Sequence, residues 1–146
     1  MKSVSLWIVG SIGIDDIKTC VADRKNLLGG SVPYSTIAAS FYARPGAVGV
    51  VGTDCPKAFD ARWGRFGIDL SGVQRVEGGT FRWGCKYDDN MIERETLKTD
   101  LGVFADFKPE LPEAYRAAPF VMLGNIQPEL QMHVLKQSTG ARFVAL

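Results

Sequence analysis

The chain has 146 residues, of which 46% are hydrophobic and 23% are charged. These values are typical of one globular domain that buries roughly 68–70% of its unfolded surface. Its 17 lysines and arginines oppose 16 aspartates and glutamates, with no basic run, so bulk charge does not favour nucleic-acid binding. No apolar segment reaches the ~20 residues that cross a bilayer, so no membrane partner is expected.

The N-terminus and the cysteines bear on location and redox state. Residues 1–6 lead into a strand-like run without a long apolar region or a small-residue cleavage site, so no signal peptide is expected. Cys20, Cys55 and Cys85 are widely spaced and His133 is the only histidine, a spacing that does not match a zinc site. We therefore expect a cytoplasmic protein with reduced cysteines and without metal ligands. Nothing marks any of these cysteines as an activated nucleophile.

The first elements in the chain are two strands. Residues 4–12 are a short apolar run that contains glycine, which is typical of a buried strand. A dinucleotide fingerprint is not completed, because Ile12 stands at its second glycine and residues 14–21 predict a second strand instead of a helix. Asp15 lies just past the end of the first strand, where α/β proteins place ligand-contacting side chains. An aspartate that bonds its own backbone in a turn is the alternative.

A glycine pair, Gly29 and Gly30, precedes a predicted helix over residues 31–43. Two adjacent glycines allow positive φ angles or the close approach of a ligand to the backbone. Ser31 is expected to cap the helix, with Pro33 near its first position. The N–H groups at such a helix start suit a polyhydroxylated or anionic ligand. An ordinary tight turn between strand and helix is the alternative.

The central and final segments alternate between strands and helices. Residues 47–52 predict a buried strand, followed by a helix to Gly67 that Thr53 or Asp54 caps, and Asp54 is assigned mainly this structural role. A short helix over 109–118, a strand over 119–123, a helix over 128–137 and a strand over 141–146 follow. This order predicts a parallel sheet with right-handed crossovers. Because the chain stops within the last strand, we expect it to be the first half of a longer chain.

Residues 73–99 differ from this pattern and predict an inserted antiparallel sheet. A short strand over 73–76 precedes residues 80–87, which alternate strictly, so that one face carries four apolar or aromatic side chains: Phe81, Trp83, Cys85 and Tyr87. A polar return strand follows over 91–98. The aromatic face must be covered by the parent domain, a ligand or another subunit. Burial against the domain and a lid or dimer surface both remain open.

In their order, these features resemble the amino-terminal half of the ribokinase-like (PfkB) family of carbohydrate and nucleoside kinases. The segments that carry the resemblance are residues 9–15 (VGSIGID), 28–31 (LGGS), 48–54 (VGVVGTD), 67–69 (GID) and the inserted strands. The resemblance implies an α/β fold with a Rossmann-like three-layer αβα arrangement, a mostly parallel sheet and a small antiparallel β lid. It makes residues 1–146 a single substrate-binding half-domain, with residues 13–24 and 73–99 contributing to the lid.

The resemblance also implies a function. The family transfers a phosphoryl group from ATP, with Mg²⁺, to a hydroxyl of a sugar or nucleoside. In this chain Asp15, Gly29, Gly30 and the adjoining Ser31 would hold the substrate hydroxyls, and Arg82 in the lid would contact the substrate. Lid strands pair two subunits in several members, which implies a homodimer through the β lid.

This sequence departs from the family at several points. Asparagine often stands in the family where Gly13 and Tyr34 stand here, so a ribose-type hydrogen-bond set is not expected and Tyr34 is assigned to stacking on, or packing beside, another substrate. Asn125 is assigned to the same cleft, with capping of its own loop as the alternative. The family's glycine-rich turn with its catalytic aspartate has no counterpart, so no catalytic residue is assigned and ATP- and Mg²⁺-binding residues are expected beyond Leu146. A non-catalytic binding or dimerisation module built on the half-fold is the alternative function.

Overall fold

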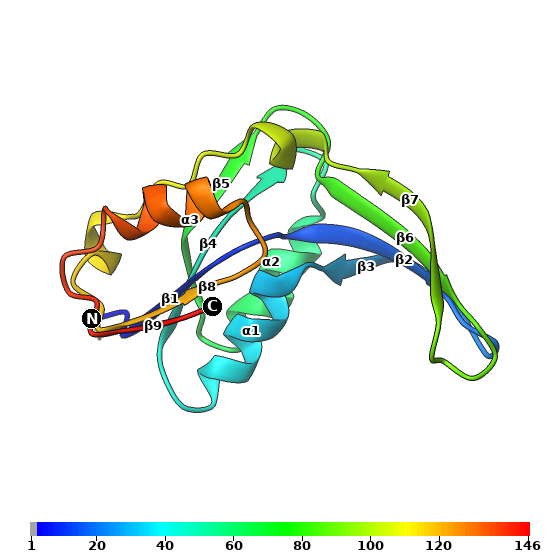
Figure 1. Ribbon diagram of the computed structural model, residues 1–146, viewed down its shortest axis with the longest axis horizontal. Helices are drawn as coiled ribbons and strands as arrows, with labels where there is room; N and C mark the ends of the chain where they lie inside the picture. Colours follow the sequence, from blue (N-terminus) through cyan, green and yellow to red (C-terminus); the bar gives the residue numbers. More distant parts are fainter. Residues whose placement is uncertain (1–2) are drawn as a thin grey trace.

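The computed structural model describes residues 3–146, so Met1 and Lys2, at the start of the N-terminal segment, lie outside the described residues. These residues form a five-stranded sheet in the order β5-β4-β1-β8-β9 and a four-stranded sheet in the order β3-β2-β6-β7. The strands are β1 (Leu6–Val9), β2 (Gly13–Lys18), β3 (Asp23–Gly29), β4 (Pro45–Gly52), β5 (Asp69–Val76), β6 (Phe81–Tyr87), β7 (Arg94–Asp100), β8 (Phe120–Leu123) and β9 (Phe143–Ala145). The smaller sheet extends away from the body of the molecule, to the right in Figure 1.

Helices cover both faces of the larger sheet. Within residues 3–146 the helices are α1 (Ser31–Ser40), α2 (Lys57–Gly64), α3 (Pro128–Leu135) and two short 3-10 helices, η1 (Gly102–Asp106) and η2 (Glu113–Tyr115). In Figure 1, α1 and α2 lie on one side of this sheet and α3 lies on the other. In this part of the chain, no helix has both the length and the apolar composition that crossing a membrane requires.

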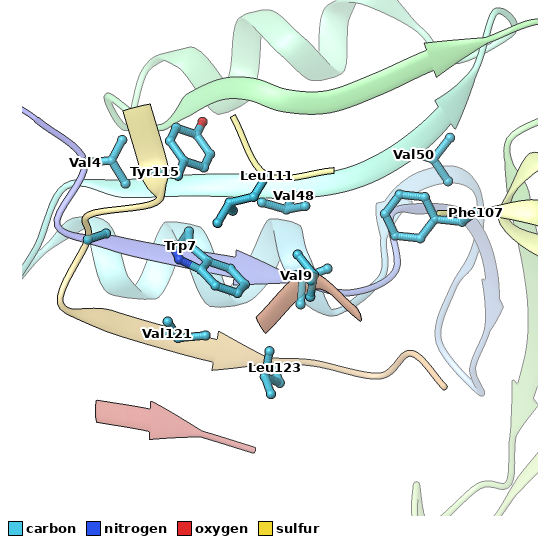
Figure 2. Close-up of a cluster of buried hydrophobic side chains, with 12 residues drawn as sticks. Val4, Trp7, Val9, Val48, Val50, Phe107, Leu111, Tyr115, Val121 and Leu123 are labelled. Carbon is cyan, nitrogen blue, oxygen red and sulfur yellow. The ribbon is translucent and has the colours of Figure 1, made fainter. Parts of the chain in front are cut away.

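Two hydrophobic clusters form the core, one on each face of the five-stranded sheet. Alternate side chains of a strand point to opposite faces, so Trp7 and Val9 enter one cluster while Ile8 enters the other. Figure 2 shows the first cluster, in which Trp7 lies between side chains of β4 and β8. The second cluster packs under α1 and α2 and contains Val32 and Trp63. The predicted three-layer αβα arrangement with a parallel sheet is confirmed, since every neighbouring pair in this sheet is parallel.

The predicted lid is present, but it is a mixed sheet instead of an antiparallel one. Its outer pairs, β2–β3 and β6–β7, are antiparallel, whereas its central pair, β2–β6, is parallel. The reason is that β2 follows β1 and β6 follows β5, two parallel strands of the body, so both enter the lid in the same direction. The lid is therefore two hairpins side by side.

The bounds of the lid also differ from the predicted residues 13–24 and 73–99. Residues 73–76 belong to β5 in the body, where Val73 pairs with Gly49 and Val76 pairs with Gly52. The lid includes all of β3, up to Gly29. The first half of β3 is charged, and its sequence shows no pattern typical of a strand. It is extended because it pairs with β2.

Three local predictions about helices are wrong. The N-cap of α1 is Gly30 instead of Ser31, because Gly30 adopts a φ of 92°, which favours glycine. The N-cap of α2 is Pro56, so neither Thr53 nor Asp54 caps that helix. The predicted helix over residues 109–118 shrinks to η2, since the two prolines in its first half remove backbone donors.

Candidate functional site

A cleft of about 310 Å³ lies between the body and the lid, at the carboxyl end of β1. Side chains and backbone from β2, α1, the lid strands and the loop after β8 line it: Ser11, Asp15, Gly30, Ser31, Phe81, Trp83, Arg94 and Asn125. Four of the site residues predicted from the sequence therefore come together here. They are Asp15, Gly30, Ser31 and Asn125.

Asn125 joins three segments of the body at the floor of this cleft. Its Oδ1 accepts hydrogen bonds from the Ser11 backbone N–H at 3.2 Å, from Ser11 Oγ at 3.0 Å and from Ser31 Oγ. The Ser31 N–H in turn donates to Ser11 Oγ at 3.2 Å. A backbone N–H can only donate, so the acceptor must be the amide oxygen and the amide NH₂ of this exposed residue keeps its two donors for a ligand. The capping alternative does not hold for α3, which begins after Gln127 without a side-chain cap.

Asp15 lies within β2, in register with Trp83 on the parallel neighbour β6. The alternative of a turn aspartate is therefore excluded. Burial raises the pKa of the Asp15 carboxyl, and the nearby charge of Asp16 raises this pKa further. No hydrogen bond contributes to the shift, so this half-buried carboxylate keeps its acceptor sites for a ligand.

The glycine pair allows the segments around Asp15 to pack closely. A Cβ at Gly29 would lie 2.1 Å from Asp15 Oδ2, and a Cβ at Gly30 would lie 2.4 Å from the Ser11 carbonyl oxygen. That carbonyl accepts a hydrogen bond from the Val32 N–H at 3.1 Å, within the first turn of α1. Gly29 itself therefore gives space to the Asp15 side chain, whereas Gly30 brings the start of α1 against the end of β1.

An aromatic wall lies beside Asp15, on the neighbouring lid strand β6. Phe81 and Trp83 are alternate residues of β6 and share the face predicted from the sequence. The Arg94 guanidinium lies over the Trp83 ring, 4.9 Å from its centroid. Among residues 3–146, Arg94 forms no ion pair with a carboxylate, so its N–H donors remain available beside the wall. Ser11 and Arg94 were not found from the sequence, because their place depends on tertiary packing and on the β6–β7 register.

Three predicted site residues do not line the cleft. Gly29 lies behind the Asp15 side chain, and the other two, Tyr34 and Arg82, make contacts elsewhere. Tyr34 is 63% exposed on α1, and its hydroxyl donates to the Leu28 carbonyl oxygen at 2.9 Å. Arg82 is on the opposite face of β6 from Trp83 and donates to Asp54 Oδ2 and Asn26 Oδ1, both at 3.2 Å. In both cases the side chain is held by contacts within the protein.

A second, mainly apolar hollow of about 450 Å³ adjoins the cleft and shares Asn125 with it. Its other lining residues come from η1 and from the start of α3: Leu101, Phe104, Ala105, Ile126, Gln127 and Leu130. Phe104 packs against Phe81 with their ring centroids 5.5 Å apart, which joins the two walls. Taken together, the two hollows offer polar groups at one end and apolar groups at the other.

The described residues do not supply an evident metal centre. Among residues 3–146, no three histidine, cysteine, aspartate or glutamate side chains lie close enough together to hold a metal ion.

The chain is similar in sequence to a curated kinase. No family model matches the chain. The chain is 28% identical over 142 residues to a cytidine kinase of Thermococcus kodakarensis, a match that covers 95% of this chain and 50% of that enzyme. The chain thus spans about half the length of the curated relative it matches.

Three solved structures of kinases have the same fold. A nucleoside kinase of Methanocaldococcus jannaschii, an archaeal member of the ribokinase family, has a TM-score of 0.71 at 14% identity, over 99% of this chain and 52% of that chain. Arabidopsis thaliana ribokinase complexed with ribose and ATP has a TM-score of 0.69 at 17% identity, over 93% and 50%. A Burkholderia thailandensis nucleoside kinase in complex with inosine has a TM-score of 0.68 at 13% identity, over 90% and 47%.

Proposed function

We propose that this chain, which has the ribokinase-like fold, is the substrate-binding half of an ATP-dependent kinase that phosphorylates a hydroxyl of a nucleoside or a sugar. The observation that carries the proposal is the half-buried Asp15 carboxylate, which forms no hydrogen bond with any of residues 3–146 and lines a cleft with the Asn125 amide. The resemblance to a cytidine kinase over half of that enzyme's length supports it.

The cleft provides the two kinds of group that a hydroxyl needs. A hydroxyl both donates and accepts, so it can donate to Asp15 and accept from the free NH₂ of Asn125. A partly buried carboxylate without a partner is unfavourable, and a hydrogen bond to a charged group contributes about 1.5–3 kcal/mol. A substrate hydroxyl that donates to Asp15 therefore offsets the unfavourable free energy of burying this carboxylate without a partner.

The aromatic wall and the apolar hollow favour a nucleoside over a free sugar. A nucleoside joins a hydroxylated ring to a flat base, which matches a polar cleft that adjoins the hollow lined by Phe104 and Ile126. Stacking of a base on an aromatic side chain contributes about 1–3 kcal/mol. A cytidine kinase among the relatives and a nucleoside kinase with inosine among the fold neighbours support the same choice.

Phosphoryl transfer in this proposal needs groups that residues 3–146 do not supply. When bound, ATP and Mg²⁺ provide the transferred phosphoryl group and charge neutralisation during in-line displacement. The part played by this chain is to bind the acceptor hydroxyl at Asp15 and to shield it under the aromatic wall. We assign the catalytic base and the nucleotide-binding groups to further residues of the full-length kinase, as the half-length match to its relative supports.

A second candidate is a non-catalytic module that binds a nucleoside or sugar and dimerises through its lid. The observation that favours it is the exposure of apolar side chains at the tips of both lid hairpins, where Val21 is 89% and Ile92 is 82% exposed. Sizing by light scattering distinguishes a dimer from a monomer. A dimer that binds nucleosides, encoded by a reading frame that stops after Leu146, favours the module over the kinase half.

Calorimetric titration tests the proposal. The chain is titrated with cytidine, inosine and ribose in the absence of ATP, and saturable binding at one site, tighter for a nucleoside than for ribose, is the expected result. The sequence that follows Leu146 in the reading frame is expected to contain a glycine-rich turn with an aspartate. Absence of binding to all three compounds would contradict the proposal for both candidates.

A further inference from the structure

The lid joins the body through a compact polar cluster. At the turn after β4, Asp54 Oδ1 accepts hydrogen bonds from the Thr80 N–H at 2.8 Å and from Thr80 Oγ1 at 2.6 Å. Asp54 Oδ2 accepts a hydrogen bond from Arg82 Nη2 at 3.2 Å. We name Asp54, Thr80 and Arg82 the lid-root cluster.

The lid-root cluster is built into the fold and is more than a surface ion pair. Thr80 is only 1% exposed, and its hydroxyl both donates to Asp54 and accepts from the Gly52 N–H at 3.0 Å. Burial alone would raise the pKa of Asp54, but the hydrogen bonds from Thr80, followed by the contact with Arg82, lower it below its ordinary value. The carboxylate is therefore charged at neutral pH, and each of its two oxygens accepts a hydrogen bond from Thr80 or Arg82.

The alternation of β6 connects this cluster to the cleft. Thr80 and Arg82 point to the Asp54 side, so Phe81 and Trp83, the residues that alternate with them, point to the cleft. Contacts that hold Thr80 and Arg82 in place therefore also fix the strand that carries Phe81 and Trp83. Arg82 also donates to Asn26 Oδ1 on β3, the strand that ends at Gly29 beside Asp15.

We infer that Asp54, Thr80 and Arg82 are positioning residues for the cleft: they hold Phe81 and Trp83 beside Asp15 and do not themselves contact the ligand. This role replaces the helix cap expected at Asp54 and the substrate contact expected at Arg82. The inference rests on the proposed function, because it takes this cleft as the binding site.

A ligand-free experiment tests the positioning role. The chain holds three tryptophans, Trp7 and Trp63 in the core and Trp83 in the cleft, so 5-fluorotryptophan labelling gives one ¹⁹F resonance for each site. In Arg82→Met and Thr80→Val, we expect the Trp83 resonance to shift or broaden while the two core resonances stay in place. An unchanged Trp83 resonance in Arg82→Met would overturn the inference.

A matched control is present in the body of the same chain. Arg116 Nη1 and Glu113 Oε2 form an ion pair at 3.2 Å, the same distance as between Arg82 Nη2 and Asp54 Oδ2, and neither residue lines the cleft. Arg116→Met should leave the Trp83 resonance unchanged. If Thr80→Val does not fold, Arg82→Met decides, because it removes only a partly exposed side chain. Movement of all three resonances in Arg82→Met would assign the cluster to global stability and overturn the inference.

Titration with cytidine separates positioning from direct contact. We expect Arg82→Met to raise the Kd about 3- to 10-fold, the factor that corresponds to one lost hydrogen bond, and Arg116→Met to leave it unchanged. A weaker Kd with an undisturbed Trp83 resonance would mean that Arg82 contacts the ligand directly, against the inference. If the unmodified chain binds no nucleoside, the proposed function fails, while the fluorine spectra still decide whether the lid-root cluster positions Trp83.

Discussion

Replacement of Gly29 by alanine is the most specific perturbation of the cleft. A Cβ at this position would lie 2.1 Å from Asp15 Oδ2 and 2.4 Å from Asp15 Oδ1, whereas ordinary van der Waals contact begins at 3.4 Å. Gly29 does not have a positive φ, so alanine brings no backbone strain and the Asp15 side chain must move instead. Its carboxylate then leaves the substrate hydroxyl, and we expect binding to weaken by about 1–3 kcal/mol, or roughly 5- to 150-fold.

Calorimetric titration with cytidine and thermal unfolding measure the two consequences of Gly29→Ala. The control is Gly64→Ala on α2, where a Cβ would meet nothing within 4 Å. This control should bind cytidine normally and gain up to about 1 kcal/mol in stability, because alanine favours a helix. If Gly29→Ala binds as tightly as the unmodified chain and is equally stable, then the position of the Asp15 carboxylate is irrelevant to binding and the reasoning is refuted.

Three further predictions concern separate parts of the molecule. Because burial raises the pKa of Asp15, this carboxylate becomes protonated at a higher pH than an ordinary aspartate of pKa about 3.9. Titrations with cytidine between pH 7 and pH 4 should therefore show the affinity falling as the pH approaches the raised pKa. Arg94→Met should weaken cytidine binding more than ribose binding, since the guanidinium lies beside the aromatic wall. Equal losses of affinity for cytidine and ribose would contradict a contact between Arg94 and the base. Buried Trp63 Nε1 donates to Thr36 Oγ1 at 2.9 Å, and Thr36→Val leaves this donor without a partner. The variant should therefore lower the free energy of unfolding, measured by urea denaturation, by about 1–3 kcal/mol without affecting cytidine binding.

The body of the fold follows from local sequence patterns. Buried strands of a parallel sheet are short apolar runs bounded by glycine or proline, and β4 and β8 are of this kind. The predicted strands over 47–52 and 119–123 therefore agree with Pro45–Gly52 and Phe120–Leu123. Local patterns also predicted that Asp15 follows the first strand and that the glycine pair precedes a helix.

The lid and half of the cleft depend on tertiary pairing that local patterns do not carry. The charged half of β3 has no alternating pattern and is a strand only because β2 lies beside it. The carboxylate of Asp54 suits a helix cap equally well, and only the approach of Thr80 and Arg82 decides its role. Arg94 reaches the cleft across the β6–β7 pair, whose register shifts between Gly84 and Cys85.

The central claim is that Asp15 binds a hydroxyl of a nucleoside or sugar in the cleft between body and lid. The most direct test compares calorimetric titrations of cytidine into the unmodified chain and into Asp15→Asn, with thermal unfolding of both. The account predicts one saturable site in the unmodified chain, weaker by about 1–3 kcal/mol in the variant, with nearly equal unfolding temperatures. Equal affinity in the two proteins, or a loss of stability with unchanged binding, would contradict it.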